Sequence, residues 1–317
     1  MFYEYEKIDY ENNLPFRIFF VSIARRNYHW HKAPEILWCV KGSVTLTIKD
    51  QSYRLKENSM AIINSNEIHE LKHDENDDNI LIALQPKFDY LKMYFKEIDN
   101  IVFENNMLGD IMENNTVRSM LKHIVEMIQN LDNYKTIKDS STIFKVLGSY
   151  NSLLYNLFEL KYKVINNEEK ENNYSALERL NRILKYVNQN YMDKISIVGI
   201  SDKEHMNKYY LSHFVKNILG MSLQEYINKV RLEKAIELLI STEDKVIDIS
   251  IISGFSDVKY LNNLLKKEYG CTATEYRRLY SKKRFGKIEI TNNVEHRPIN
   301  YKVCLDLIED ISVKISK

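Results

Sequence analysis

The chain has 317 residues, of which 44% are hydrophobic and 28% charged, so it is long enough to bury a sizeable core and to form two domains. Its first residues are acidic and aromatic, and no apolar run approaches the ~18 residues of a membrane span, which argues against secretion and membrane insertion. Cys39, Cys271 and Cys304 are scattered and form no CxxC pair, which argues against a disulfide framework and a cysteine zinc site. We therefore expect a cytoplasmic protein with no membrane partner.

The formal net charge of +1 conceals two regions of opposite sign. Residues 1–173 carry 21 Lys and Arg against 26 Asp and Glu, a net charge of −5, whereas residues 174–287 carry 20 against 13, a net charge of +7. A basic segment beside an acidic one is a candidate for binding a polyanion such as nucleic acid. A solvated basic face is the alternative that charge alone leaves open.

The N-terminal region has the pattern of a β-structure. From Phe16 to Leu84, short apolar and β-branched runs recur about every ten residues between polar or glycine-containing turns, which predicts antiparallel strands of a small sandwich or barrel. After Pro86 the apolar residues repeat at threes and fours, which predicts two amphipathic helices, near 117–131 and 143–157. The polar residues that follow, 166–173, have nothing to bury and predict a linker.

The basic segment is helical in pattern, and two of its stretches share one design. Each has a short helix, a turn and a second helix with one apolar and one polar face. In the first stretch, Asn207 is a favourable N-cap for a helix over 208–219. In the second, Gly254 suits the turn before a helix over about 257–269. The outward residues, expected to bind DNA, are Lys208, Tyr209, Ser212, His213, Lys216, Val258, Lys259, Asn262, Asn263 and Lys267.

Helices of this kind fit the major groove of double-stranded DNA, where Asn can bind adenine bidentately and Lys can contact guanine or phosphate. An ordinary amphipathic helix pair would show the same periodicity. Two copies about 48 residues apart, joined by an amphipathic helix over 223–240, favour DNA binding over that alternative.

From about Leu177 to Arg278, the segment resembles the double helix-turn-helix domain of AraC/XylS-family transcription regulators. The positions that carry the resemblance are Arg231, Ala235, Leu238, Leu239, Gly254, Phe255, Asp257, Tyr276 and Arg277. His213 and Asn263 stand where the family often has arginine, and Ala273 stands where it has proline. The resemblance implies that the two outward helices bind successive major-groove segments of a promoter or operator.

The predicted strands also carry four candidate metal ligands. His29, His31 and Glu35 have the spacing HxHxxxE, and His69 lies on a later strand. Histidines two positions apart on a strand point to the same side, and with a carboxylate and a third histidine they could bind a divalent metal. The spacing resembles the first motif of cupins. The same pattern occurs in sensor domains of AraC-type regulators, where the resemblance implies a sugar-binding pocket that often lacks metal.

These observations predict an α+β protein with five parts. The parts are a cupin-like β-barrel that senses an effector (1–85), a helical dimerisation and coupling region (86–165), a linker (166–173), an all-α double helix-turn-helix DNA-binding domain (174–284) and a tail of unknown role, or the beginning of another unit (285–317). We expect the effector to be a small molecule, by resemblance a sugar, and no metal or other cofactor. The expected effector-binding residues are His29, His31, Glu35, His69 and Trp38.

The predicted function is sequence-specific transcription regulation by a homodimer, and not catalysis. An effector could control promoter binding only if its affinity differs between two arrangements of the dimer. The alternative function is a metal-dependent cupin enzyme with an appended DNA-binding domain, in which His29, His31, Glu35 and His69 hold the metal. A purely structural role for the histidines is also open.

Overall fold

The computed structural model describes residues 4–10, 14–49, 51–73, 78–92, 94–110, 113–137, 140–280, 294–298, 307–308 and 311. They form two compact units. The barrel unit comprises the described residues from 4 to 172 together with those from 294 to 311, and the helical unit comprises residues 173–280. Among the described residues, no helix is both long and apolar enough to span a membrane.

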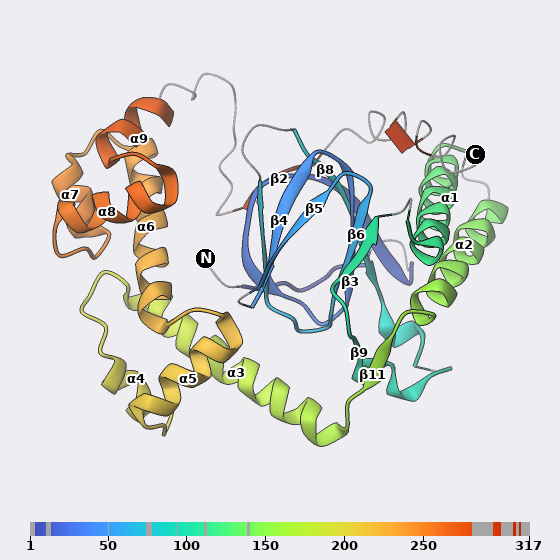
Figure 1. Ribbon diagram of the computed structural model, residues 1–317, viewed down its shortest axis with the longest axis horizontal. Coiled ribbons are helices and arrows are strands. Elements are labelled where there is room, and N and C mark those ends of the chain that lie inside the picture. The colour runs from blue at the N-terminus through green and yellow to red at the C-terminus, as the bar shows by residue number, and fades with distance from the viewer. Residues whose placement is uncertain are drawn as a thin grey trace. The chain divides into compact units, whose positions relative to one another are not determined.

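The barrel unit is built on a 10-stranded sheet that curls into a nearly closed barrel (Figure 1). Its main path has the order β10-β6-β3-β8-β2-β7-β4-β5, and β1 and β12 also pair with β2. Described neighbours are antiparallel except for β1 and β2. The strands are β1 (Glu4–Tyr5), β2 (Phe16–Trp30), β3 (Glu35–Lys41), β4 (Ser43–Ile48), β5 (Gln51–Lys56), β6 (Ser59–Ile63), β7 (His69–His73), β8 (Ile80–Pro86), β10 (Met107–Asp110) and β12 (Val294–Pro298).

Strand β3 separates two hydrophobic cores. Leu37 and Cys39 belong to the core inside the barrel, whereas Ile36 and Trp38 belong to a core that includes the helices outside it. Successive side chains of a strand point to opposite faces, so a strand covered on both sides is buried throughout. All residues of β3 before Lys41 are buried accordingly.

The two expected amphipathic helices are α1 (Asn115–Ile137) and α2 (Ser140–Phe158). They pack against each other, and residues such as Ile124 and Leu153 share a core with the outward residues of β3. The packing of an apolar helix face against a sheet face confirms the predicted α+β class for this unit.

The region 86–165 is not helical throughout, contrary to expectation. It contains the 3₁₀ helices η2 (Phe88–Tyr90) and η3 (Lys96–Asn100), then β9 (Ile101–Phe103) and β10. Strand β10 pairs with β6, and β9 pairs with β11 (Tyr162–Val164). Strands of three or four residues are too short to produce a detectable hydrophobic period.

Residues 167–173 are helical, although the sequence predicts a linker over 166–173. They form the start of α3 (Asn167–Asn190), and the boundary between the two units falls within this helix. The side-chain oxygen of Asn166 accepts a hydrogen bond from the Glu169 N–H at 2.7 Å. Glu168 and Glu169 lie in the first turn, where carboxylates favour a helix. Capping by Asn166 therefore stabilises the first turns of α3, whose side chains are mostly exposed.

The described part of the tail belongs to the barrel unit. Strand β12 pairs with β2, from Val294 opposite Arg26 to Pro298 opposite Val21. Ile308 is buried in the core that contains α1 and α2. The contacts of these described residues lie within an existing sheet and core. The remainder of 281–317 lies outside the described residues.

In the helical unit, α6 lies between two helix pairs (Figure 1). The Tyr226 hydroxyl of α6 donates to the Asn188 side chain of α3 at 3.0 Å. Phe255 packs with Leu239 and Leu261 in the core of the second pair. The helices after α3 are α4 (Ile197–Lys203), α5 (Lys208–Leu219), α6 (Leu223–Ser241), α7 (Val246–Ile252), α8 (Val258–Tyr269) and α9 (Ala273–Tyr280).

Candidate functional site

Helices α5 and α8 have matching ends. The side-chain oxygens of Asn207 and Asp257 each accept a hydrogen bond, at 2.7 Å, from the N–H three residues further on. The helices end at Gly220 and Gly270, which have φ angles of 71° and 69°. Asn207 and Asp257 are 50 positions apart, and so are Gly220 and Gly270, whereas the expected spacing is about 48 residues. The two predicted helix-turn-helix stretches are therefore copies of one local structure.

The helices that follow, α6 and α9, also begin alike. Ser222 and Glu225 form a capping box, and Thr272 and Glu275 make the corresponding reciprocal bonds. Hydrogen bonds from Ser222 lower the pKa of the Glu225 carboxyl, and the ammonium groups of Lys267 and Lys216 lower it further. The 50-residue repeat thus includes the start of a third helix, which is α6 in the first copy and α9 in the second.

The turn between α7 and α8 requires a glycine. Gly254 has a φ of +84°, and a Cβ there would lie 2.4 Å from the Tyr191 carbonyl oxygen and 2.9 Å from Arg231 Nε. Arg231 itself donates to the carbonyl oxygens of Tyr191 and Asp193, at 2.8 and 2.9 Å. The turn therefore packs directly on the arginine that holds the segment before α4.

Arg277 has the corresponding role in the second copy. It donates to the carbonyl oxygens of Leu239 and Asp244, at 3.2 and 2.7 Å, and so holds the segment before α7. In the sequence, Arg231 and Arg277 stand out only as positions that carry the resemblance to AraC/XylS-family regulators. The structure gives the physical reason for both, since each guanidinium donates hydrogen bonds to two backbone carbonyls, at a helix end or in the segment that follows it.

Most of the predicted DNA-binding residues lie on the outer faces of α5 and α8. The exposed ones are Lys208, Tyr209, Ser212, His213, Lys216, Lys259, Asn263 and Lys267. Val258 is half-buried. Asn262 is also half-buried, and its side-chain oxygen accepts a hydrogen bond from the Ala273 N–H at 2.9 Å, so its outward placement is wrong. The prediction omits Tyr210, which is exposed on α5.

The exposed faces of α5 and α8 are basic. Lysines occur at both helices, whereas Glu268 is the only acidic residue that either one contains. Tyr209 is 75% exposed, with its ring centroid 4.4 Å from that of His213. Lysine, tyrosine and imidazole side chains can donate hydrogen bonds to phosphates and base edges, so this surface suits a DNA duplex.

In the barrel unit, the structure brings His29, His31, Glu35 and His69 together. One ligand atom from each lies within 4.8 Å of the others, and all four residues are buried. Glu35 Oε2 is 3.3 Å from His31 Nε2 and 3.5 Å from His69 Nε2. The Gln85 side chain donates to the other Glu35 oxygen at 3.2 Å. The predicted convergence of these four residues on one side of the strands is confirmed.

Burial and the interaction between His31 and Glu35 shift the pKa values of these two residues in opposite directions. Desolvation by burial holds the pKa of His29 well below its usual value, and the electrostatic interaction with the Arg26 guanidinium lowers it further. Burial also disfavours protonation of His31, but its hydrogen bond with Glu35 raises the pKa of His31 above the usual value. Burial alone would raise the pKa of Glu35, yet the hydrogen bond from His31 and the nearby imidazole of His69 hold it well below its usual value. Both pKa directions favour the charged forms of Glu35 and His31 over the neutral ones.

Trp38 does not join this cluster. It is fully buried in the core shared with α1 and α2, outside the barrel. Trp38 and Glu35 are three positions apart on β3, and an odd separation places two side chains on opposite faces of a strand. The expected role of Trp38 in effector binding is wrong, and strand alternation could have shown this from the sequence.

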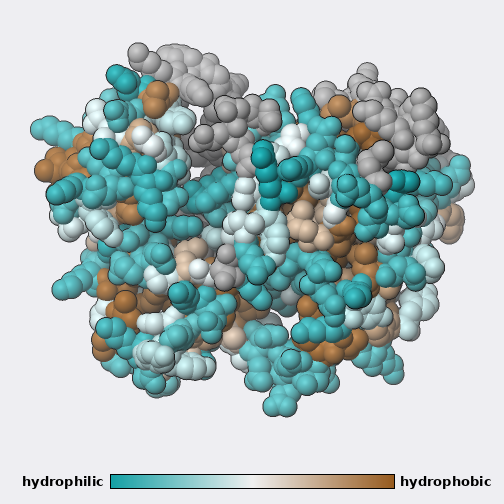
Figure 2. Space-filling view, in the orientation of Figure 1, coloured by the Kyte–Doolittle hydropathy of each residue, from teal (hydrophilic) through white to brown (hydrophobic). Residues whose placement is uncertain are grey.

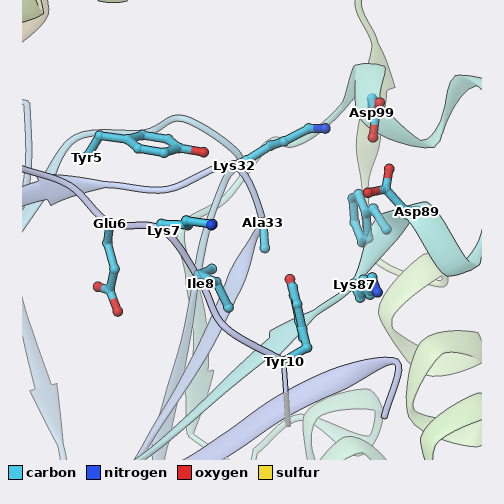
Figure 3. A pocket seen from close by; sticks show the side chains of 11 residues that line it. Tyr5, Glu6, Lys7, Ile8, Tyr10, Lys32, Ala33, Lys87, Asp89 and Asp99 are labelled. Carbon is cyan, nitrogen blue, oxygen red and sulfur yellow. The ribbon is translucent and has the colours of Figure 1, made fainter. Parts of the chain in front are cut away.

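A cavity of about 130 Å³ lies beside the cluster, between the N-terminal segment and the barrel (Figure 3). The hydroxyl groups of Tyr5 and Tyr10 and the ammonium group of Lys32 point into the same space (Figure 3). Glu6, which also lines the cavity, lies 3.8 Å from His29 Nε2. Sequence reasoning missed this cavity. The full lining is Tyr5, Glu6, Lys7, Ile8, Tyr10, Lys32, Ala33, Lys87, Phe88, Asp89 and Asp99.

Comparison with known proteins identifies both units. Residues 22–145 match the family of AraC-like ligand binding domains, and residues 200–279 match a helix-turn-helix domain family. The chain is similar to the HTH-type transcriptional activator RhaR of Mannheimia succiniciproducens, with 23% identity over 83% of this chain and 93% of that protein. It is 25% identical to RhaS of Klebsiella pneumoniae, over 78% and 86%.

A third similarity is more local. The bifunctional transcriptional activator/DNA repair enzyme AdaA of Bacillus subtilis is 31% identical over 102 residues, which are 32% of this chain and 48% of that protein. The two matched domain families occur in the same chain, with the ligand-binding domain before the helix-turn-helix domain. The chain thus combines the two domains of AraC-type transcription regulators, an AraC-like ligand-binding domain followed by a helix-turn-helix domain.

Proposed function

We propose that the protein regulates transcription, without catalysing a reaction, by binding promoter DNA through α5 and α8 in response to a small molecule in the barrel unit. The observation that carries this proposal is the 50-residue repeat, which presents two capped helices, α5 and α8. Their outer faces carry lysines, and Glu268 is the only acidic residue of the two helices. Its relatives include transcriptional activators. Because its target is chromosomal DNA, the protein would act in the cytoplasm.

The DNA-contacting residues are proposed from their exposure. Lys208, Lys216, Lys259 and Lys267 would bind phosphates or guanine edges, because each ammonium group is exposed on α5 or α8. Tyr209, Ser212, His213 and Asn263 would supply hydrogen bonds, and Val258 would contact a thymine methyl group. Asn262 is excluded from this set, because its side-chain oxygen accepts a hydrogen bond from the Ala273 N–H.

The small molecule would bind in the cavity shown in Figure 3. Tyrosine rings suit the apolar faces of a sugar, while the ammonium and carboxylate groups of Lys32, Lys87 and Asp89 suit its hydroxyls. We therefore propose a sugar as the effector. His29 and its buried partners would contribute through Glu6, which lies between them and the cavity.

A homodimer would form through the outer face of α2. Phe144 and Tyr155 are 74% and 67% exposed, and they are 11 positions apart, which places both on one side of a helix. Gly148 and Asn151 lie between them on that side and are also exposed, so another helix can approach closely. Hydrophobic residues otherwise reach the visible surface in separate areas among hydrophilic ones (Figure 2).

The test is a selection of random DNA duplexes by the full-length protein at near-physiological salt, repeated with a panel of monosaccharides. We expect enrichment of a motif that occupies two adjacent major grooves, and a change in its affinity with one of the sugars. The double variant K208A/K259A should lose the enrichment, whereas Lys145→Ala, an exposed lysine of α2, should retain it. Salt-sensitive binding without any enriched motif would contradict the proposal.

A further inference from the structure

The cavity of Figure 3 is lined by three lysines that come from separate parts of the barrel unit. Lys7 follows β1, Lys32 lies in the turn between β2 and β3, and Lys87 follows β8. Among the described residues, none of the three forms an ion pair with a carboxylate. Folding thus brings three ammonium groups, far apart in the sequence, to the lining of one cavity.

Glu6 is one of three acidic residues in the same lining, and two arginines compensate its charge. Arg17 Nη1 lies 3.1 Å from one oxygen of the Glu6 carboxylate, and Arg26 Nη2 lies 2.9 Å from the other. Guanidinium groups stay protonated in proteins, so this pairing does not depend on pH in the physiological range. Glu6 therefore adds no net negative charge to the cavity.

The other two acidic residues of the lining, Asp89 and Asp99, share one lysine. Lys92 Nζ lies 2.6 Å from Asp89 Oδ1 and 2.7 Å from Asp99 Oδ2. The hydrogen bond from Lys92 lowers the pKa of Asp89, and the ammonium groups of Lys32 and Lys87 lower it further. Each carboxylate of the lining is therefore held by at least one cation, and the lysines of the lining remain as surplus positive charge.

Lys87 is the most firmly held of the three lysines. Its backbone N–H donates to the Pro15 carbonyl oxygen at 2.8 Å, and its Nζ lies 5.4 Å from the centroid of the Tyr10 ring. Such a cation–π contact orients an ammonium group and leaves its N–H groups available. Lys7 and Lys32 are exposed, as solvated lysines are, but Lys87 is half-buried. Charges of one sign in a concave surface focus their field and attract an ion of opposite charge.

We propose that the effector is an acidic sugar, whose carboxylate or phosphate group binds to the lysines of the lining while its ring binds to the tyrosines. The Tyr10 hydroxyl donates to the Pro86 carbonyl oxygen at 3.3 Å and keeps its lone pairs for a sugar hydroxyl. Burial raises the pKa of Tyr10 to about 12, so this hydroxyl stays neutral at neutral pH. The inference rests on the proposed function and deepens it, because it names the charge of the effector.

The test is calorimetric titration of the full-length protein with two sets of sugars. One set is glucose, glucuronate and glucose 6-phosphate, and the other is galactose, galacturonate and galactose 6-phosphate. We expect at least one acidic sugar to bind about tenfold or more tightly than the neutral sugar with the same ring. Its affinity should fall as the salt concentration rises, because salt screens the attraction. The comparison of uronate with phosphate identifies the anionic group.

Lys87→Gln should weaken binding of the acidic sugar about tenfold or more, and leave binding of the neutral sugar unchanged. Lys87→Arg keeps the charge and should retain the preference for the acidic sugar. The matched control is Lys56→Gln, an exposed lysine of β5 outside the lining, and it should bind as the wild type does. If Lys87→Gln does not fold, Lys32→Gln replaces it, because Lys32 is exposed.

A neutral sugar that binds as tightly as its acidic counterparts would overturn the proposal. So would the absence of binding by all four acidic sugars at millimolar concentration, or equal binding of the acidic sugar by the wild type and K87Q. The affinity for the selected DNA duplex is measured separately. A neutral sugar that binds and alters this affinity would leave the proposed function intact without this inference. An acidic sugar that binds without altering it would support this inference and contradict effector control of DNA binding.

Discussion

The side-chain oxygen of Asn262 in α8 accepts a hydrogen bond, 2.9 Å long, from the backbone N–H of Ala273 at the start of α9. The first N–H groups of a helix have no partner inside it, so Asn262 satisfies one of them from a neighbouring helix. We expect Asn262→Ala to destabilise the helical unit by about 1 kcal/mol and to leave base preference unchanged.

Urea unfolding and duplex selection on the same variant separate the two roles. Asn263→Ala is the matched control, because its side chain is exposed. It should leave stability unchanged and weaken DNA binding. If instead N262A changed the selected motif at constant stability, Asn262 would be a base-contacting residue after all.

Gly254 and Gly270 both have left-handed backbone angles, but only Gly254 is crowded. A Cβ at Gly270 would meet nothing within 4 Å, whereas one at Gly254 would collide with the Tyr191 carbonyl. Gly270→Ala should therefore cost about 1 kcal/mol from backbone conformation alone, and Gly254→Ala should cost several times as much. Thermal unfolding checks the difference, and equal costs for the two variants would refute the close packing of the turn.

The lysines of α5 and α8 should control the salt dependence of DNA binding. If Lys208 or Lys259 contacts a phosphate, its change to alanine should weaken binding to all sequences and reduce the slope of log K against log salt by about 1. Fluorescence anisotropy at several salt concentrations measures this slope. Lys145→Ala should leave it unchanged, because α2 lies outside the proposed DNA surface.

The capping box at α6 predicts a dependence of stability on pH. Glu225 has a folded-state pKa below its usual value of 4.5, because Ser222 donates hydrogen bonds to its carboxylate. The stabilisation is therefore fully present above about pH 4.5 and is lost as the pH falls through the lower, folded-state pKa. Glu225→Gln keeps an acceptor but not the charge. Its Tm should lie below that of the wild type at pH 7 and approach it in acid.

Ile308 tests whether the chain after the helical unit stabilises the barrel unit. Its side chain is fully buried with α1 and α2, so Ile308→Ala should cost about 2–4 kcal/mol of barrel stability. Leu279→Ala is a suitable control, since Leu279 is 52% exposed. Hydrogen exchange in α1 and α2 would report the loss. Unchanged protection there would show that Ile308 makes no energetic contribution to this core.

Several features of the candidate site followed from local sequence rules. The convergence of His29 and His31 needed only the alternation of a strand, and the start of α5 needed only Asn207 as an N-cap. The prediction for Trp38 is wrong, although the same alternation places its side chain on the face of β3 opposite to that of Glu35. Asn262 could not be placed in this way, because its partner Ala273 is on another helix and only the packing of α8 against α9 brings them together.

Local sequence patterns predict the order of a strand-rich and a helical part, the repeated helix-turn-helix pattern and the types of side chain that meet in the barrel. These depend on interactions between residues a few positions apart, such as caps and hydrophobic periods. Three other features are visible only in the folded protein: β12 pairs with β2, Glu6 lies beside His29, and a cavity opens next to Glu6. Contacts between distant segments depend on how whole elements pack, and no local pattern of residues encodes that packing.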